Sequence, residues 1–125
     1  RLPGVRGGLP LEDGARINGV HFTPDALIAR HPTRGLVKWS RADGRIIATV
    51  PCAEPVRFGA RPSNNHRFVA TNDGEKGVVV ATLPALELVG RAKTSAAVTS
   101  LAVSDDGKRV AVCAGQTLSV LAVER

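Results

Sequence analysis

Short apolar runs separated by turn residues extend from about residue 17 to the end of the chain. The runs are rich in Val, Ile and Ala, and the β-branched residues among them favour pleated, half-buried strands. No window repeats apolar residues at helical spacing over three turns. The best helical candidate, residues 83–92, contains Pro84 and Gly90, and a proline inside a helix removes a hydrogen bond. The pattern therefore predicts an all-β chain.

Three segments of the chain share one order of strands and turns, and such self-similarity is the signature of a repeat architecture. Each segment starts with a short apolar strand and continues through a turn, a second strand, a glycine-containing turn and a third strand. The predicted first turns are residues 23–25, 60–65 and 104–107, and the second strands are residues 26–30, 67–71 and 109–114. The third strands are residues 36–40, 78–82 and 117–122, and the fourth strands, in the first two segments alone, are residues 45–50 and 86–91.

The repeat length is typical of the blades of a β-propeller. Phe22, Phe58 and Val103 take equivalent positions and lie 36 and 45 residues apart. Four-stranded blades repeat at about 40–45 residues, and stacked blades cover both faces of each sheet. The sequence predicts three four-stranded antiparallel blades after a lead-in loop. The predicted bounds are residues 1–16 for the loop and about 17–51, 52–92 and 93–125 for the blades, the last one incomplete.

Three blades do not close a ring, because known propellers have about four to eight. We therefore expect the chain to form part of a larger ring of about seven blades. The chain starts with Arg1 and contains no Met, so we expect a processed chain or a piece of a longer protein. The remaining blades would come from further residues, from another chain or from self-association.

The segment VHFTPDALIARHPTRGLVKWS resembles a WD-repeat blade, with Phe22 before the first turn and Trp39 closing the third strand. Ser40 follows Trp39, so the usual Trp-Asp pair is absent, and so is the Gly-His pair. The segments DGRIIATVPCAEPV and HRFVATNDG are similar to YVTN-type propeller repeats. These resemblances imply a propeller and leave its function open.

The order of features also resembles the exchange-factor family that activates the Sar-type GTPase of COPII coats at the endoplasmic reticulum. A blade ending in Trp39 precedes the Arg-Phe strand at residues 56–59, a blade without Trp follows, and then come VTSLAVS and the pair Asp106-Gly107. This resemblance implies guanine nucleotide exchange in vesicle-coat assembly. Nothing here matches the loop on which that activity depends, so no catalytic residue is transferred.

The net charge of +6 is spread along the chain, and the aromatic residues are one Trp and three Phe. A nucleic-acid surface would combine clustered basic residues with stacking rings, so we do not expect nucleic acid as a partner. A broad basic face for an acidic partner or a membrane surface stays open. No apolar run approaches the roughly 20 residues of a membrane span.

No set of residues has the pattern of a catalytic, cofactor or metal site. His21, His31 and His66 lie far apart without metal-ligand spacing. Cys52 and Cys113 are expected to be buried free thiols, which fits a reducing compartment. We therefore expect no enzyme activity from these residues, although blades outside this chain could hold an active site.

Without such a site, the candidates for a functional role are residues on the surface of the turns. Loops at residues 31–35 and 72–77 should share one face of the propeller, and His31, Arg34, Glu75 and Lys76 are the candidates for partner contacts. We expect a protein-binding propeller scaffold segment in the cytoplasm or at the cytosolic face of the endoplasmic reticulum. Its partner would be a protein, such as a small GTPase or further blades from another chain. The alternatives are the exchange factor and a bacterial secreted or periplasmic propeller.

Overall fold

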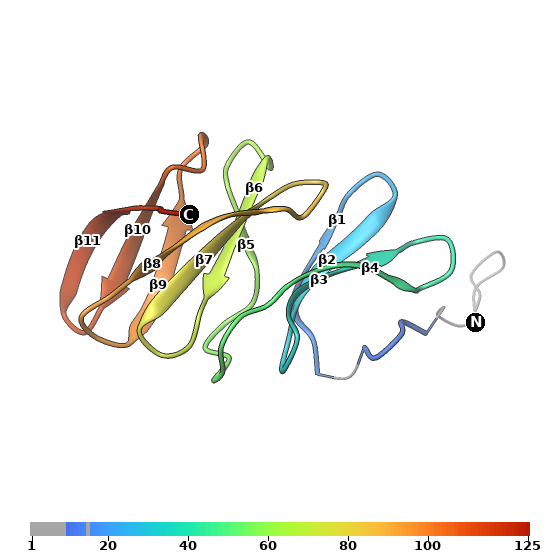
Figure 1. Cartoon of the computed structure of the whole chain (residues 1–125), viewed down its shortest axis with the longest axis horizontal. Helices are drawn as coiled ribbons and strands as arrows, with labels where there is room; N and C mark the ends of the chain where they lie inside the picture. Colours follow the sequence, from blue (N-terminus) through green and yellow to red (C-terminus); the bar gives the residue numbers. More distant parts are fainter. Residues whose placement is uncertain (1–9, 15) are drawn as a thin grey trace, which may run out of the picture.

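The computed structural model describes residues 10–14 and 16–125, and this part of the chain forms three antiparallel sheets without a helix (Figure 1). Blade 1 contains β1 (Asn18–Phe22), β2 (Ala26–His31), β3 (Gly35–Ser40) and β4 (Ile46–Val50). Blade 2 contains β5 (Arg61–Pro62), β6 (Phe68–Asn72), β7 (Gly77–Thr82) and β8 (Leu88–Lys93). Blade 3 contains β9 (Val98–Val103), β10 (Arg109–Ala114) and β11 (Thr117–Ala122). The predicted all-β fold of propeller blades is confirmed.

The strands of each blade pair in sequence order, and every pair is antiparallel. Figure 1 shows the three sheets side by side, with blade 2 between the other two. Short turns join neighbouring strands, as expected for a meander. The linkers at residues 51–60 and 94–97 carry the chain from one blade to the next, and the first of them is the longest connection between described strands.

The register corrects one sequence-based equivalence. Phe22 pairs with Leu27 and Val103 pairs with Val110, and in blade 2 the corresponding pair is Pro62 with Val69. Pro62, not Phe58, is therefore the equivalent position. With Pro62 in place, the repeat is nearly regular at 40 and 41 residues.

Residues 56–59, which the apolar pattern assigned to a first strand, form none. Their backbone groups are bound by side chains of β6 instead of a strand. The Thr71 hydroxyl lies 3.3 Å from the carbonyl oxygens of both Phe58 and Gly59, and the amide of Arg57 donates to the Asn72 side chain at 3.0 Å. Gly59 also packs on Gly19 of β1, where a Cβ atom would lie 2.6 Å from the Gly19 Cα. This close contact leaves no room for a side chain.

Two apolar clusters fill the spaces between the blades. Val79 and Ala81 of β7 pack with blade 1, whereas Val78 and Val80 pack with blade 3. All four side chains are fully buried. The third strand of blade 2 is thus covered on both faces, which explains why its sequence is continuously apolar and does not alternate.

The outer face of blade 1 is covered by the residues that precede it. Trp39 and Val37 pack there with Leu11 and Ile17, and the Trp39 indole donates a hydrogen bond to the Glu12 carbonyl at 2.7 Å. The described residues of the predicted lead-in form no strand, and residues 1–9 and 15 lie outside the described part. The segment at residues 10–14 therefore serves as packing for blade 1.

Candidate partner-binding surface

The turns that carry the predicted site residues lie beside the linkers between blades. The β6–β7 turn accepts two backbone hydrogen bonds from this region. Thr94 of the second linker donates to the Lys76 carbonyl at 2.9 Å, and Val98, the first residue of β9, donates to the Glu75 carbonyl at 3.0 Å. Gly74 donates to the Ala53 carbonyl of the first linker at 2.8 Å. We call the surface formed by residues 32–34, 51–60, 73–76 and 94–97 the linker face. It lies along the lower side of Figure 1.

His31 does not project from the linker face, and the prediction that it does is wrong. Its side chain is buried, and Nδ1 accepts hydrogen bonds from the amides of Thr33 and Arg34, both at 3.1 Å. Because Nδ1 accepts, Nε2 carries the proton and donates to the Asp13 carbonyl at 2.9 Å. The imidazole closes the β2–β3 turn and ties it to the segment before blade 1. A histidine at a strand end satisfies backbone groups that the turn leaves free.

Arg34 is half-exposed on the same turn and pairs with Asp13. Its Nε donates to an Asp13 carboxylate oxygen, and His31 lies on the same oxygen at 3.3 Å. The hydrogen bond from Arg34 lowers the pKa of Asp13, with a further contribution from His31. The guanidinium is thus oriented while part of it faces solvent. Sequence reasoning missed Asp13, which lies 21 residues from its partner.

Glu75 and Lys76 are exposed at the tip of the β6–β7 turn, while their carbonyl groups are held by the linker. Asp73 fastens this turn at its base. One of its carboxylate oxygens accepts from the Ala53 amide at 2.7 Å, and the other accepts from Arg91 at 3.0 Å. The Asp-Gly pair in the sequence indicated the turn, but it did not reveal the ion pair with β8.

Below the linker face lie a buried cation and a buried thiol. Arg30 is fully buried, and its Nη2 donates to the Ala53 carbonyl at 3.0 Å. Its Nε and Nη1 have no hydrogen-bond partner among the described residues. Burial raises the pKa of Cys52, against an opposing effect of the Arg30 charge. A thiol with a raised pKa is a poor nucleophile.

Cys52 and Cys113 both carry free thiols, as predicted, but only Cys52 is buried. We expect alkylation of the native chain to modify Cys113 at least about tenfold faster than Cys52, because the reaction needs an accessible thiolate. Iodoacetamide labelling over time, followed by mass spectrometry of the peptides, measures both rates. Labelling in urea is the control and should bring the rates together. Faster labelling of Cys52 in the native chain would contradict this packing.

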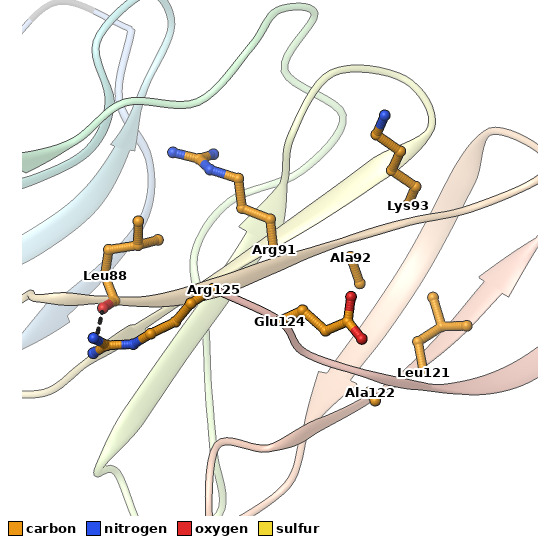
Figure 2. A pocket seen from close by; sticks show the side chains of 9 residues that line it. Leu88, Arg91, Ala92, Lys93, Leu121, Ala122, Glu124 and Arg125 are labelled. Carbon is orange, nitrogen blue, oxygen red and sulfur yellow. Dashed lines mark hydrogen bonds between the residues drawn. The ribbon is translucent and has the colours of Figure 1, made fainter.

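A groove of about 580 Å³ lies between β8 and the segment that follows β11 (Figure 2). The amide of Arg91 donates to the Glu124 carbonyl at 2.7 Å, and that of Glu124 donates back at 3.0 Å. Figure 2 shows Arg91 and Lys93 extending away from the Glu124 carboxylate, while Arg125 reaches the Leu88 carbonyl at 3.5 Å. The lining residues include one carboxylate and no histidine or thiol. Such a groove suits an extended segment better than acid–base chemistry.

A second groove, of about 540 Å³, lies between the β1–β2 turn and blade 2. Its lining is mostly apolar and includes Phe22, which is largely exposed and has Arg41 5.0 Å from its ring centroid. His66 is also among its lining residues. His21, another lining residue, bonds the Ala60 carbonyl at 2.8 Å and has a structural role.

Within residues 10–14 and 16–125, no group of three or more His, Cys, Asp or Glu residues is arranged to hold a metal ion. The same part of the chain contains no helix that is long and apolar enough to cross a membrane.

Three solved structures share this architecture. The chain resembles the β-propeller domain of Cps50 (Swd1) from Myceliophteria thermophila, with a TM-score of 0.66 at 12% identity, covering 97% of this chain and 36% of that one. It resembles the WD40 repeats of RRP9, with a TM-score of 0.62 at 20% identity, covering 86% and 35%. It also resembles the dihydro-heme d1 dehydrogenase NirN, with a TM-score of 0.61 at 21% identity, covering 98% and 25%.

The likeness establishes the fold, which is that of WD40 β-propeller domains. The chain spans about a third or less of the length of these structures. No protein-family model and no curated protein matches the sequence. Because WD40 repeats and a dehydrogenase share the architecture, the fold alone does not assign a function. The comparisons do not show the exchange-factor resemblance, which stays a hypothesis.

Proposed function

We propose that this chain is a propeller segment that binds a protein partner through the linker face. One observation carries the proposal: the exposed side chains of Arg34, Glu75 and Lys76 stand on turns whose backbones are fixed by hydrogen bonds to other parts of the structure. Residues displayed on a rigid backbone lose less conformational entropy on binding than residues on a mobile loop. Such an arrangement favours recognition.

The charges of the linker face favour a protein over nucleic acid. On this face Arg34 pairs with Asp13 of the segment before blade 1, Asp73 pairs with Arg91 of β8, and Glu75 stands next to Lys76. Acidic and basic groups therefore occur together at this surface. A nucleic acid needs a continuous basic stripe, whereas a folded protein can present both signs of charge.

The proposed role is binding without catalysis. The buried Cys52 has a raised pKa, and His31 is fully engaged in hydrogen bonds, so neither is available for chemistry. The free thiols fit the cytoplasm as the compartment.

Site-specific photo-crosslinking tests this proposal. A photoreactive amino acid is placed at Glu75, or at Ala42 on the β3–β4 turn as a control that is likewise exposed, and the chain is expressed in its source cells. We expect discrete protein adducts from position 75 and none from position 42. Combining Arg34→Glu with Lys76→Glu should reduce the adduct at position 75 about tenfold, which corresponds to roughly 1.4 kcal/mol. Equal adducts at both positions, or none at position 75, would reject the linker face as the binding surface.

A further inference from the structure

Blade 2 departs from the repeat at its first strand. β1 and β9 have five and six residues, whereas β5 has two, and residues 56–59 before it pair with no strand of the described chain. Blade 2 lies between the other two (Figure 1), so both neighbours of this segment are present. The irregularity therefore belongs to the blade itself. A stretch that breaks an otherwise consistent pattern is expected at a functional site.

Buried polar side chains of β6 hold the irregular segment. Thr71 takes the position of Ala29 in blade 1 and Val112 in blade 3, since each lies two residues after the pairing partner of the last residue in the first strand. The Thr71 hydroxyl lies 3.3 Å from two carbonyl oxygens of the segment, and Asn72 accepts a hydrogen bond from the Arg57 amide at 3.0 Å. Both polar side chains are fully buried. The segment thus has a fixed backbone without being part of a sheet.

Two cavities, of about 420 and 250 Å³, lie against this segment and share its residues 56–58. The larger one reaches the start of β1 and Arg61 of β5, and the smaller one reaches the start of β9. The first strands of all three blades therefore contribute to their walls. Because residues 51–60 belong to the linker face, the cavities adjoin the surface proposed for partner binding.

The cavities carry positive charge without a counterion. The described residues that line them include Arg57 and Arg61 and no carboxylate. Both arginines are exposed, and neither forms a salt bridge within the described part of the chain. Elsewhere on the linker face, by contrast, Arg34 is paired with Asp13. A concave site with one sign of charge focuses the electric field and attracts ions of the opposite sign.

The Arg61 guanidinium is oriented by an aromatic ring. Its Cζ lies 5.5 Å from the centroid of the Phe58 ring. Arg41 is stacked on Phe22 in a similar way, but it also donates to two carbonyl groups of the β1–β2 turn at 3.3 and 3.5 Å. Arg61 has no such acceptor among the described residues. A guanidinium that stacks through its face keeps its N–H groups for a ligand.

We propose that these cavities bind a phosphoryl group through Arg57 and Arg61, and that the partner of the linker face carries this group on a phosphorylated side chain. Two guanidinium groups match the charge of about −1.5 to −2 that a phosphoryl group has at neutral pH, whereas a carboxylate would leave one of them unmatched. Each guanidinium can donate two parallel hydrogen bonds to phosphoryl oxygens. The part of this proposal that concerns the partner rests on the proposed function, and the anion site does not.

Titration with inorganic phosphate tests the site without a partner. At constant ionic strength, the amides of residues 56–61 in the full chain should show saturable NMR shifts. Arg57→Gln and Arg61→Gln should each weaken phosphate binding at least about tenfold, and acetate should bind the native chain at least about tenfold more weakly than phosphate. Arg41→Gln removes another stacked arginine and should leave the affinity unchanged. Because these arginines are exposed, the variants should keep the native amide spectrum elsewhere.

Three results of this titration would overturn the site. They are shifts scattered over the other arginines, equal weakening by Arg41→Gln, and equal affinity for phosphate and acetate.

Phosphatase treatment tests the source of the phosphoryl group. Crosslinking from Glu75 is repeated in a lysate of the source cells, with and without prior phosphatase treatment. The adducts should disappear after treatment and in the variant that combines Arg57→Gln with Arg61→Gln. Adducts that persist in both cases would overturn the phosphorylated partner, although the linker face would still bind a protein. Phosphate binding without any adduct would instead reject the linker face and leave a site for a free anion, which also overturns the phosphorylated partner.

Discussion

Trp39→Ala is expected to destabilise the chain by about 3–5 kcal/mol. The Trp39 ring is fully buried against Val37 and Ala29, and Leu11 and Ile17 cover it from outside. Its removal leaves a cavity that the sheet cannot close, and the Glu12 carbonyl loses its donor. Since domains of this size have about 5–15 kcal/mol of stability, the change removes a large fraction of it. Urea unfolding monitored by circular dichroism measures the difference.

Trp39→Phe is the matched control for this prediction. It keeps an aromatic ring and removes the indole N–H, so we expect a smaller loss, about 1–3 kcal/mol, made up of the unsatisfied carbonyl and the smaller volume. Trp39 is the single tryptophan of the sequence, and its fluorescence in the unmodified chain should shift to longer wavelength when the covering segment is released. A loss below about 1 kcal/mol for the alanine variant would mean that Leu11 and Ile17 do not cover blade 1.

The strands were predictable where one local pattern decides the structure. The apolar run at residues 78–80 indicated a strand covered on both faces, and β7 is covered by blades 1 and 3. The bounds predicted for β10 and β11 agree with the structure because a glycine turn separates two alternating runs. The first strand of blade 2 was misplaced. There, hydrogen bonds from Thr71 and Asn72 replace the strand ladder, and sequence periodicity carries no trace of them.

The candidate site was predictable at the level of turns and not at the level of contacts. Glu75 and Lys76 are exposed because polar residues at a turn tip have no neighbour to bury them. His31 also lies at a turn, as the last residue of β2, but its ring is buried because it forms hydrogen bonds with two turn amides and the Asp13 carbonyl. The pairs Arg34–Asp13 and Arg91–Asp73 join residues 21 and 18 positions apart. Such pairs depend on how blades and linkers come together, which a single sequence does not encode locally.

The second prediction with a large effect concerns Arg30. Its substitution is expected to raise the stability of the chain, whereas that of Trp39 lowers it. Arg30→Met is expected to stabilise the chain by about 1–3 kcal/mol, because a buried charge without a compensating partner opposes folding. Arg30 forms no salt bridge with any described residue, and two of its three guanidinium nitrogens have no hydrogen-bond partner there. Its one acceptor, the Ala53 carbonyl, keeps the hydrogen bond from Gly74 when the arginine is removed. Methionine fills the space of the aliphatic stem with a flexible apolar chain.

Two further measurements separate this explanation from a packing effect. Arg30→Ala also removes the charge but leaves a cavity, so it should be less stable than Arg30→Met by about 2 kcal/mol or more. The Arg30 charge lowers the pKa of Cys52 against the effect of burial, so in Arg30→Met the pKa should rise further and alkylation of Cys52 should slow. A loss of stability in Arg30→Met, together with an unchanged Cys52 rate, would show that the guanidinium is well compensated in the folded chain. The buried cation would then be a stabilising part of the contact between blades 1 and 2.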